Sequence, residues 1–409
     1  MLKETVVKCI KYPYRLIKNC CFKIDASNAL KRIAHKANSN AKIKVGFIVQ
    51  MPEIWDKQLT VYEAMLADEM FDPYLIVLPS FDLALNTFKE YGEELEFFRS
   101  LYPDEKIILA YYDEKWIDLK ELKLNYVFYQ RCWENYLPEC YTTKNVIKYS
   151  KTCYIPYCFH GLNVKKSYYS TLFFYYLYMM FCCSNEQLNE FPKRRNQKRT
   201  FSGFPSLEGV INEPVLKYNS ILWTPRWTDD KEFGGSTFFK YMYSIMDIKK
   251  SFPNTNLVLR PHPLTFQNAI KTHKLTETEI EDYKTELSKM EIQFDKNKLI
   301  EDSFLETDIL ITDFSSVLMT FFLTGKPIIY CAETDNVDFT ESFTKIIECS
   351  YIAQTWSDVM KYVSLLLRGE DPLKERRYEA IRQMTDDNKE STKRILQYLF
   401  DDNRKLAKE

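Results

Sequence analysis

The sequence predicts an α/β protein built from two doubly wound domains, each with a parallel sheet between layers of helices. The chain has 409 residues, of which 45% are hydrophobic. This length is large for one core, so we expect two domains of roughly 200 residues each. Short apolar runs also alternate with longer mixed segments in two successive series, which is the pattern of strands that alternate with helices.

The first series begins at Lys42 and ends at His160. Its apolar runs are IKVGFIVQ, YLIVLP, KIILAYY, NYVFYQ and CYIPYCFHG, and a helix-like KQLTVYEAMLADE follows the first of them. Each run has the length and composition of a buried strand. We therefore assign residues 41–210 to a first domain, after a basic and aromatic segment at residues 1–40.

The second series begins near Ser220. Its strand-like runs are SILWTP, NLVLRPHP, DILITDFSS and KPIIYC, and helices are expected near 237–250, 276–290 and 317–324. We assign residues 211–375 to a second domain. Residues 376–409 are charged with a helical pattern, so we expect them to pack back across both domains.

A polar segment separates the two series. EFPKRRNQKRTFSGFPSLEG is rich in turn formers and carries a block of like charges that would resist burial. We place the linker near residues 205–219. In open parallel sheets a ligand binds outside the carboxyl ends of the strands, so two such sheets would face a central cleft.

The composition argues against several classes of protein. Lys and Arg total 56 against 57 Asp and Glu, so no overall field indicates a nucleic-acid partner. The eleven cysteines are scattered without a C-x-x-C pair, which favours reduced thiols. Cys153, Cys158 and His160 are close in sequence, but a strand would not bring them to one ion, and no metal site is predicted.

Two segments raise the question of a membrane. Residues 6–23, VVKCIKYPYRLIKNCCFK, mix cations with apolar and aromatic side chains, which suits an anionic membrane surface or a ragged helix. Residues 167–184 carry no charge but are short for a spanning helix; they suit an interfacial segment or a core helix that runs into a buried strand. No secretory signal opens the chain, so we expect a cytoplasmic protein on the inner face of the membrane.

The most informative stretch is DILITDFSSVLMTFFLTGKPIIY at residues 308–330. Asp313–Ser316 read as a turn between a strand and a helix, with residues that favour a helix N-cap. Ser315 and Ser316 would then present hydroxyl and backbone N–H groups at the helix N-terminus, which suits a phosphate. An ordinary capping turn is the alternative.

Two other strand ends carry a histidine. In LVLRPHP, Arg260 offers a forked cation for phosphate oxygens and His262 can stabilise charge on a departing phosphate. In FHGLNVKK, His160 is placed as a general base for a hydroxyl, followed by Gly161 and Lys165. On its own, a histidine at a strand end is more often structural, and for His160 the alternative is a core histidine that is hydrogen-bonded to the backbone.

Five motifs in order resemble the CDP-glycerol glycerophosphotransferases, the teichoic-acid primases and polymerases of bacteria. They are HGLNVK (160–165), SGFPSLE (202–208), ILWTPRW (221–227), LVLRPHP (257–263) and LITDFSSVLMTFFLTGKPIIYC (310–331). The resemblance implies a GT-B fold, with an acceptor domain first, a nucleotide-binding domain second, and a cleft between them.

The resemblance also implies roles for individual residues. His160 would be the base, and His262 would lie near the donor pyrophosphate with Arg260 beside it. The paired serines correspond to Ser315 and Ser316, and Asp313 precedes them. The donor would be a CDP-polyol, the acceptor a polymer or lipid-linked hydroxyl, and no tightly bound cofactor is expected, although Mg²⁺ carried by the nucleotide is compatible with the site.

The sequence departs from the family pattern near the donor. GFPSLE lacks the Arg and Asp of the usual G-x-P-R-x-D element, and TPRWT places Arg226 away from the usual position. The H-P and S-S elements also resemble sialyltransferases and Kdo transferases, which use CMP-sugars. A GT-B glycosyltransferase of capsule or surface polysaccharide synthesis and a non-catalytic binding subunit therefore stay open as alternatives.

Overall fold

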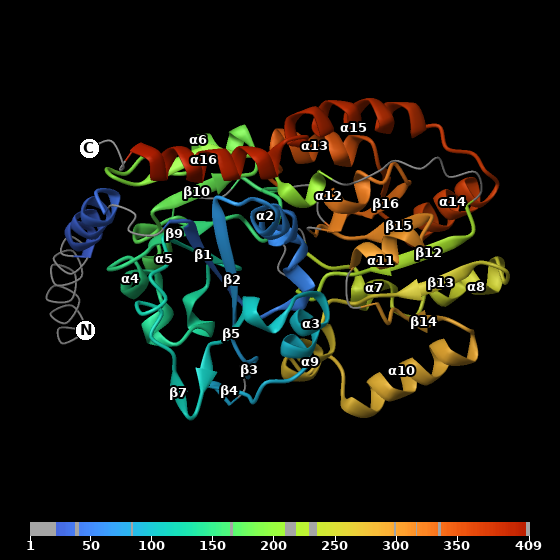
Figure 1. Cartoon of the computed structure of the whole chain (residues 1–409). Helices are drawn as coiled ribbons and strands as arrows, with labels where there is room; N and C mark the ends of the chain where they lie inside the picture. Colours follow the sequence, from blue (N-terminus) through green and yellow to red (C-terminus); the bar gives the residue numbers. More distant parts are fainter. Residues whose placement is uncertain are drawn as a thin grey trace, which may run out of the picture. The chain divides into compact units, whose positions relative to one another are not determined.

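The computed structural model describes residues 22–36, 41–82, 85–163, 167–208, 218–228, 235–297, 300–315, 317–333 and 337–405. They form two compact units (Figure 1). Unit 1 comprises the described residues within Met1–Cys158, Val164–Ser206 and Glu390–Glu409. Unit 2 comprises those within Phe159–Asn163 and Leu207–Lys389.

Seven parallel strands form the sheet of unit 1, in the order β11-β10-β9-β8-β1-β2-β5. Their bounds are β1 (Ile43–Val49), β2 (Phe71–Val77), β5 (Ile107–Leu109), β8 (Tyr126–Tyr129), β9 (Lys151–Tyr154), β10 (Met179–Cys182) and β11 (Lys198–Phe201). Most of these strands are apolar throughout because both faces of the sheet are covered by helices.

Successive side chains of a strand enter opposite cores of unit 1. Phe47 packs with a helix at residues 22–34, with α2 (Asp56–Ala67), with α3 (Glu93–Leu101) and with α16 (Ser391–Lys405). Ile48 belongs to the core on the other face, with α4 (Thr143–Val146) and α5 (Leu172–Tyr175). The C-terminal helix α16 lies along α2 (Figure 1).

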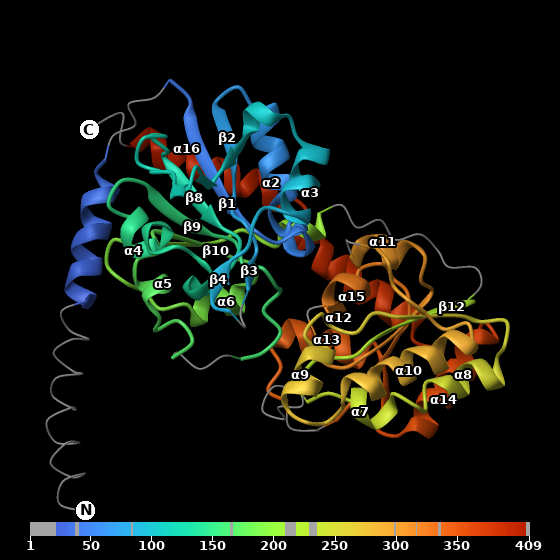
Figure 2. The same ribbon diagram turned by 90° about the horizontal axis from the view of Figure 1, so that it is seen from below.

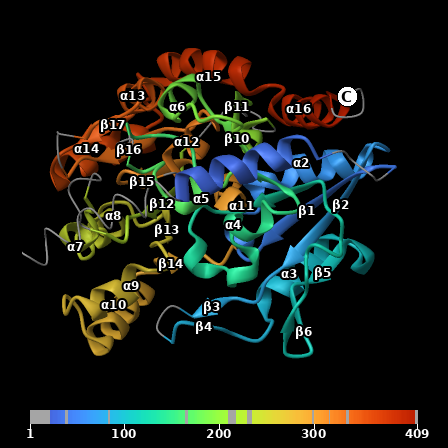
Figure 3. The same cartoon turned by 90° about the vertical axis from the view of Figure 1, so that its left-hand side faces the viewer.

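The remaining elements of unit 1 are short. Helix α6 (Asn185–Glu190) joins β10 to β11 and is capped by the Ser184 hydroxyl, which accepts from the backbone N–H of Gln187. Two hairpins, β3 (Phe81–Asp82) with β4 (Thr87–Phe88) and β6 (Tyr111–Tyr112) with β7 (Lys115–Trp116), project from the body of the unit (Figure 3).

Six parallel strands form the sheet of unit 2, in the order β14-β13-β12-β15-β16-β17. Their bounds are β12 (Ser220–Thr224), β13 (Asn256–Leu259), β14 (Gln293–Phe294), β15 (Ile309–Thr312), β16 (Ile328–Cys331) and β17 (Tyr351–Ala353). Numbered within the unit, this order is 3-2-1-4-5-6, that of dinucleotide-binding domains.

The helices of unit 2 cover this sheet. They are α7 (Phe238–Tyr241), α8 (Met246–Ser251), α9 (Thr265–Lys271), α10 (Glu277–Lys289), α11 (Ile300–Leu305), α12 (Val317–Phe322), α13 (Glu341–Glu348), α14 (Trp356–Leu367) and α15 (Lys374–Asn388). Helices α7, α8, α10 and α14 share one core with β12, β13 and β15 (Figure 2). Helices α10 and α14 each begin with a capping box, headed by Thr276 and Thr355.

The α/β class with two parallel sheets is confirmed, but three local predictions are wrong. His160 does not end a strand, because β9 stops at Tyr154. The helix expected near 237–250 is two short helices, α7 and α8. The charged block before the second series is only partly a connection, because β11 lies within it as an edge strand. Its cations are satisfied there: Lys198 pairs with Asp402 and the Arg199 guanidinium donates to backbone carbonyls.

The two segments with a possible membrane role have different outcomes. Residues 6–21 lie outside the described residues. Residues 167–184 contain α5 and the fully buried strand β10, so they follow the reading as a core helix that runs into a buried strand. Among the described residues, no helix has the length and apolar character needed to cross a membrane.

Candidate functional site

Most of the predicted donor-side residues lie at one edge of the unit 2 sheet. The strand order reverses at β12, which has β13 on one side and β15 on the other. In sheets of this kind, a ligand binds outside the carboxyl ends of the strands at that reversal. Arg226 follows β12, His262 follows β13, and Phe314 and Ser315 follow β15. The topology therefore brings residues from three separate motifs to one edge.

Asp313 holds the loop after β12 in place at this edge through buried hydrogen bonds. Its side chain is fully buried, and its Oδ2 accepts hydrogen bonds from the backbone N–H groups of Arg226, at 3.0 Å, and Thr237, at 3.1 Å. Oδ1 accepts from the Thr237 hydroxyl. Desolvation raises the pKa of Asp313 to about 6, although these hydrogen bonds act in the opposite direction. Asp313 thus fixes the loop after β12 rather than reaching outward.

Arg226 and Ser315 are both neighbours of Phe314, Arg226 in space and Ser315 in sequence. The guanidinium carbon of Arg226 is 5.5 Å from the centroid of the Phe314 ring, within the range of a cation–π contact. The Oγ of Ser315 is buried without a hydrogen-bond partner among the described residues. An unsatisfied buried hydroxyl is costly, so this atom is suited to a ligand oxygen.

His262 is held as a neutral imidazole. Its Nδ1 accepts the backbone N–H of Leu264 at 3.1 Å, so its proton resides on Nε2. Desolvation of the ring, and then the positive charge of Arg226, lower its pKa to about 4. The ring is 5.8 Å from that of Trp227, at an angle of 34°. Part of the side chain is exposed to solvent, although neighbouring atoms crowd the ring enough to lower its pKa, and Nε2–H can act as an uncharged donor.

The guanidinium of Arg260 bonds to the loop that follows β14. Its Nη1 donates to Oδ2 of Asp295 at 2.6 Å and to the carbonyl of Asn297 at 2.7 Å. Desolvation raises the pKa of Asp295, but hydrogen bonds from Ser303 and Arg260 outweigh it and hold the pKa below its usual value. Arg260 therefore braces the loop after β14 through this ion pair.

His160 lies on unit 2, although the chain around it belongs to unit 1. The segment 159–163 crosses to unit 2 and bonds to the loop before α13. Thr340 donates its backbone N–H to the carbonyl of Gly161, at 3.1 Å, and its hydroxyl to the carbonyl of His160, at 3.0 Å. Asn163 closes the contact, because its Nδ2 donates to Oδ1 of Asp338 at 2.7 Å.

Gly161 is required by close approach rather than by a turn. A Cβ at this position would meet Cδ2 of Phe343 at 2.8 Å and Cε2 at 3.0 Å, closer than side-chain atoms pack. Phe343 stacks on Phe339 at 5.5 Å, and both rings contact Phe314, at 5.2 and 5.5 Å. One aromatic cluster thus supports the turn that holds Ser315 and the segment that carries His160.

The structure brings together five of the predicted site residues on unit 2. His160 and Gly161 join Arg226, His262 and Ser315 through the aromatic cluster and the three strand ends. Asp313 lies beneath them, and Arg260 is turned toward Asp295. Ser316 and Lys165 lie outside the described residues. Within the part of the chain that the structure describes, no group of three or more His, Cys, Asp or Glu side chains could hold a metal ion.

The comparison with protein families covers most of unit 2 and the first part of α16 in unit 1. Residues 209–401 match the family of CDP-glycerol:poly(glycerophosphate) glycerophosphotransferases. The match covers 193 of the 409 residues, and it shows that this part of the chain is similar to that family. The match contains the strand ends with Arg226, His262 and Ser315, and it confirms the resemblance predicted from the motifs. His160 precedes the matched range. No curated protein matches the sequence.

Solved structures confirm the GT-B fold at low sequence identity. The wall teichoic acid polymerase TagF is 12% identical with a TM-score of 0.53, over 98% of this chain and 99% of that one. A putative UDP-N-acetylglucosamine 2-epimerase from Listeria monocytogenes is 13% identical with a TM-score of 0.55, over 87% and 95%. The UDP-GlcNAc 2-epimerase from Neisseria meningitidis is 11% identical with a TM-score of 0.55, over 88% and 100%.

Several residues of the candidate site are not predicted by the sequence motifs. Trp227 lies in the motif ILWTPRW, but nothing in that motif predicts its contact with the His262 ring. Thr237 is far from Asp313 in sequence, so no local pattern links them. Thr340 could have been found, because it heads the apolar and charged pattern TESFTKII as an N-cap, and its hydroxyl does accept the N–H of Phe343.

Proposed function

We propose that the protein transfers glycerol phosphate from CDP-glycerol to a hydroxyl of a surface polymer or lipid-linked acceptor, releasing CMP. The family match supports this class of transferase and its cytidine donor. A TagF variant with this fold was soaked with CDPG, which is consistent with the same donor. The acceptor and the residue roles are our inference.

The observation that carries the proposal is the gathering of chemically different groups at one sheet edge. Arg226 supplies a permanent cation, His262 an uncharged N–H donor, and Ser315 a hydroxyl without a hydrogen-bond partner among the described residues. Together they suit the pyrophosphate of a nucleotide donor, which needs donors that do not have to be deprotonated.

The transfer requires one bond to form and one to break. The acceptor oxygen attacks the phosphorus that carries glycerol, and the bond from that phosphorus to the bridging oxygen of CMP breaks. His160 takes the acceptor proton, while Arg226 and His262 stabilise the charge that develops on CMP. Such a step depends on positioning and electrostatics and needs no covalent enzyme intermediate.

Arg260 acts in this proposal as a positioning residue. Its ion pair with Asp295 holds the loop that follows β14, next to β13 and His262. Asp313 does the same for the loop that carries Arg226. We also propose that residues 6–23 hold the enzyme on the anionic inner face of the membrane, where lipid-linked acceptors reside.

A panel of nucleotides tests the donor class. A ligand that binds only the folded state stabilises it by RT ln(1 + [L]/Kd), which is about 2.7 kcal/mol at a concentration of 100 Kd. CMP and CDP-glycerol should raise the melting temperature, whereas UMP and GMP at the same concentration should not. A shift with UMP alone would contradict the proposal.

A further inference from the structure

A second candidate binding site lies in unit 1, at the edge of the sheet where the parallel strands begin. A cavity of about 280 Å³ opens there, beside the first residues of β8 and β9, Tyr126 and Lys151. Substrates of doubly wound domains bind at the carboxyl ends of the strands, whereas this cavity lies at the amino ends. It is therefore separate from the residues described above.

The lining of this cavity is strongly basic. Lys36, Lys120, Lys123 and Lys151 line it against a single acidic residue, Glu121. Lys36 follows the helix at 22–34, and its Nζ donates to the carbonyl of Tyr149 at 2.6 Å. The lysines come from three separate parts of the chain, so the fold, and not a local run of sequence, gathers them.

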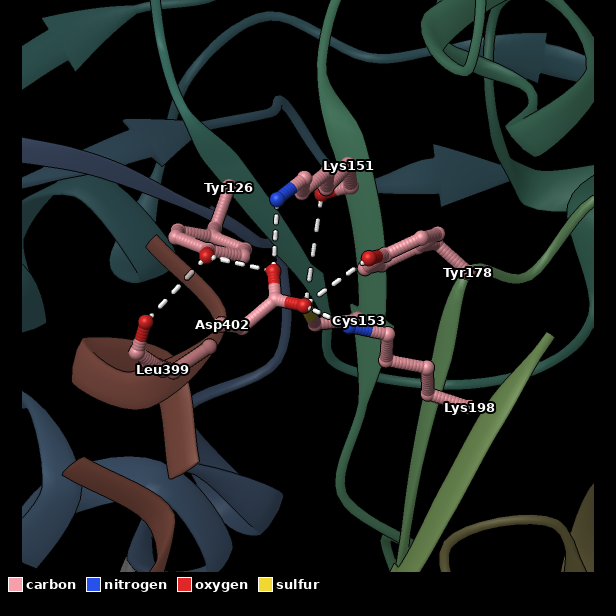
Figure 4. A network of polar contacts seen from close by, with 7 residues as sticks. All are labelled: Tyr126, Lys151, Cys153, Tyr178, Lys198, Leu399 and Asp402. Carbon is pink, nitrogen blue, oxygen red and sulfur yellow. Dashed lines mark hydrogen bonds and ion pairs between the residues drawn. The ribbon is translucent and has the colours of Figure 1, made fainter. Parts of the chain in front are cut away.

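The floor of the cavity adds to this charge. Lys151 is 5% exposed and its Nζ lies 2.5 Å from Oδ2 of Asp402, which also pairs with Lys198 (Figure 4). The network as a whole holds two lysines against one carboxylate, although Lys198 does not line the cavity. Hydroxyls of Tyr126 and Tyr178 donate to the same carboxylate, at 2.7 and 2.9 Å, which satisfies Asp402 fully.

Lys151 is buried, Lys36, Lys120 and Lys123 are exposed, and the four lysines against one glutamate in the lining favour an anionic ligand. The network around Asp402 fixes Lys151 in place, so the charge does not have to be organised when a ligand arrives. Pockets for drug-sized molecules measure roughly 300–1,000 Å³, so this cavity suits a small anion or a headgroup. Lysine ammonium groups bind phosphate as point charges, so a cluster of them suits a phosphate group.

We propose that this cavity is a binding site for a phosphate ester, held by Lys36, Lys120 and Lys123 above Lys151. The phosphate belongs either to a soluble ester or to the headgroup of an anionic lipid. The site is independent of the proposed transfer reaction, because it lies on unit 1 and contains none of the residues assigned to that reaction.

The test compares two double variants with the same change in charge. Lys120→Gln with Lys123→Gln alters the cavity, and Lys144→Gln with Lys148→Gln alters exposed lysines that do not line it. Calorimetric titrations with inorganic phosphate and with glycerol 1-phosphate are made in the presence of saturating CMP, which occupies the donor site. Vesicles of phosphatidylglycerol and of phosphatidylcholine form the lipid arm.

Saturable binding of either soluble phosphate, or of phosphatidylglycerol but not phosphatidylcholine vesicles, is expected for the wild type. The cavity variant should lose roughly tenfold or more in affinity, whereas the control variant should stay within twofold. The arm that saturates identifies the source of the phosphate. Equal losses of affinity in both variants would show that net charge alone explains the binding. The absence of saturable binding in every arm would overturn the proposed site.

Discussion

Replacing Gly161 by alanine should uncouple His160 from the rest of the site while the donor groups stay intact. The new Cβ would meet three atoms of the Phe343 ring between 2.8 and 3.3 Å. That ring is stacked on Phe339 and packed against Phe314, so it has little freedom to move. The backbone of the segment 159–163 must therefore shift instead.

Overpacking of a well-packed site costs about 1–3 kcal/mol. If this cost falls on the docked position of the segment, the docked population drops by a factor of about 5 to 150, at 1.4 kcal/mol per tenfold. The two hydrogen bonds from Thr340 to the carbonyls of His160 and Gly161 would be lost together. We expect acceptor-dependent CMP release to fall by a similar factor.

The assay measures CMP release with and without acceptor, and donor affinity by calorimetry. Gly161→Ala should lower the acceptor-dependent rate with donor affinity within about twofold of wild type. Adding Phe343→Leu should recover part of the rate, since a smaller side chain makes room for the Cβ, and Phe343→Leu alone serves as the control. A wild-type rate for Gly161→Ala, or an equal loss of donor affinity, would refute the reasoning.

Three further changes test other parts of the account. His262 has a pKa lowered to about 4, so CMP release should show no inflection from this residue between pH 5 and 8; an inflection near pH 6.5 that disappears in His262→Gln would contradict its neutral role. Asp313→Ala leaves three donors without their acceptor and should reduce the free energy of unfolding, measured in urea, by about 3 kcal/mol or more. The pKa of Asp313 is raised to about 6 in the folded state. The free energy of unfolding of the wild type should therefore fall relative to that of Asp313→Asn as the pH rises from about 4 to 6. If the two proteins show the same dependence of stability on pH, this reasoning is wrong. Asp402→Ala should cost about 3–5 kcal/mol, since it leaves Lys151 buried without a counter-charge, and Lys151→Met should restore part of it; a loss below 1 kcal/mol would show that α16 is held by other contacts.

The strands of both sheets can be predicted from the sequence, because parallel strands that are covered on both faces are apolar throughout. IKVGFIV and SILWT are visible for this reason, and they set the two sheets. The turn after β15 was also visible, since Asp313 and Ser315 stand between a strand and a helix. What each residue does there depends on long-range contacts: Asp313 turned inward because Thr237 and the backbone of Arg226 meet it from distant segments.

Other features could not be read from local patterns. Arg260 has the composition of a phosphate ligand, but its orientation is decided by Asp295, thirty-five residues further along the chain. The move of His160 onto unit 2 depends on Thr340 and Phe343, which lie about 180 residues away. β11 was missed because an edge strand tolerates the lysines and arginines that made its segment resemble a connection.

CMP release from CDP-glycerol by wild type, His160→Ala and His262→Ala, each with and without a hydroxyl acceptor, tests the central claim most directly. Wild type should release CMP faster when acceptor is present. His262→Ala should lose both reactions, because both need the leaving CMP stabilised, and His160→Ala should lose only the acceptor-dependent one, by roughly 10²- to 10⁴-fold. If wild type leaves CDP-glycerol intact but consumes a CMP-sugar, or if His262→Ala releases CMP at the wild-type rate, the account is contradicted.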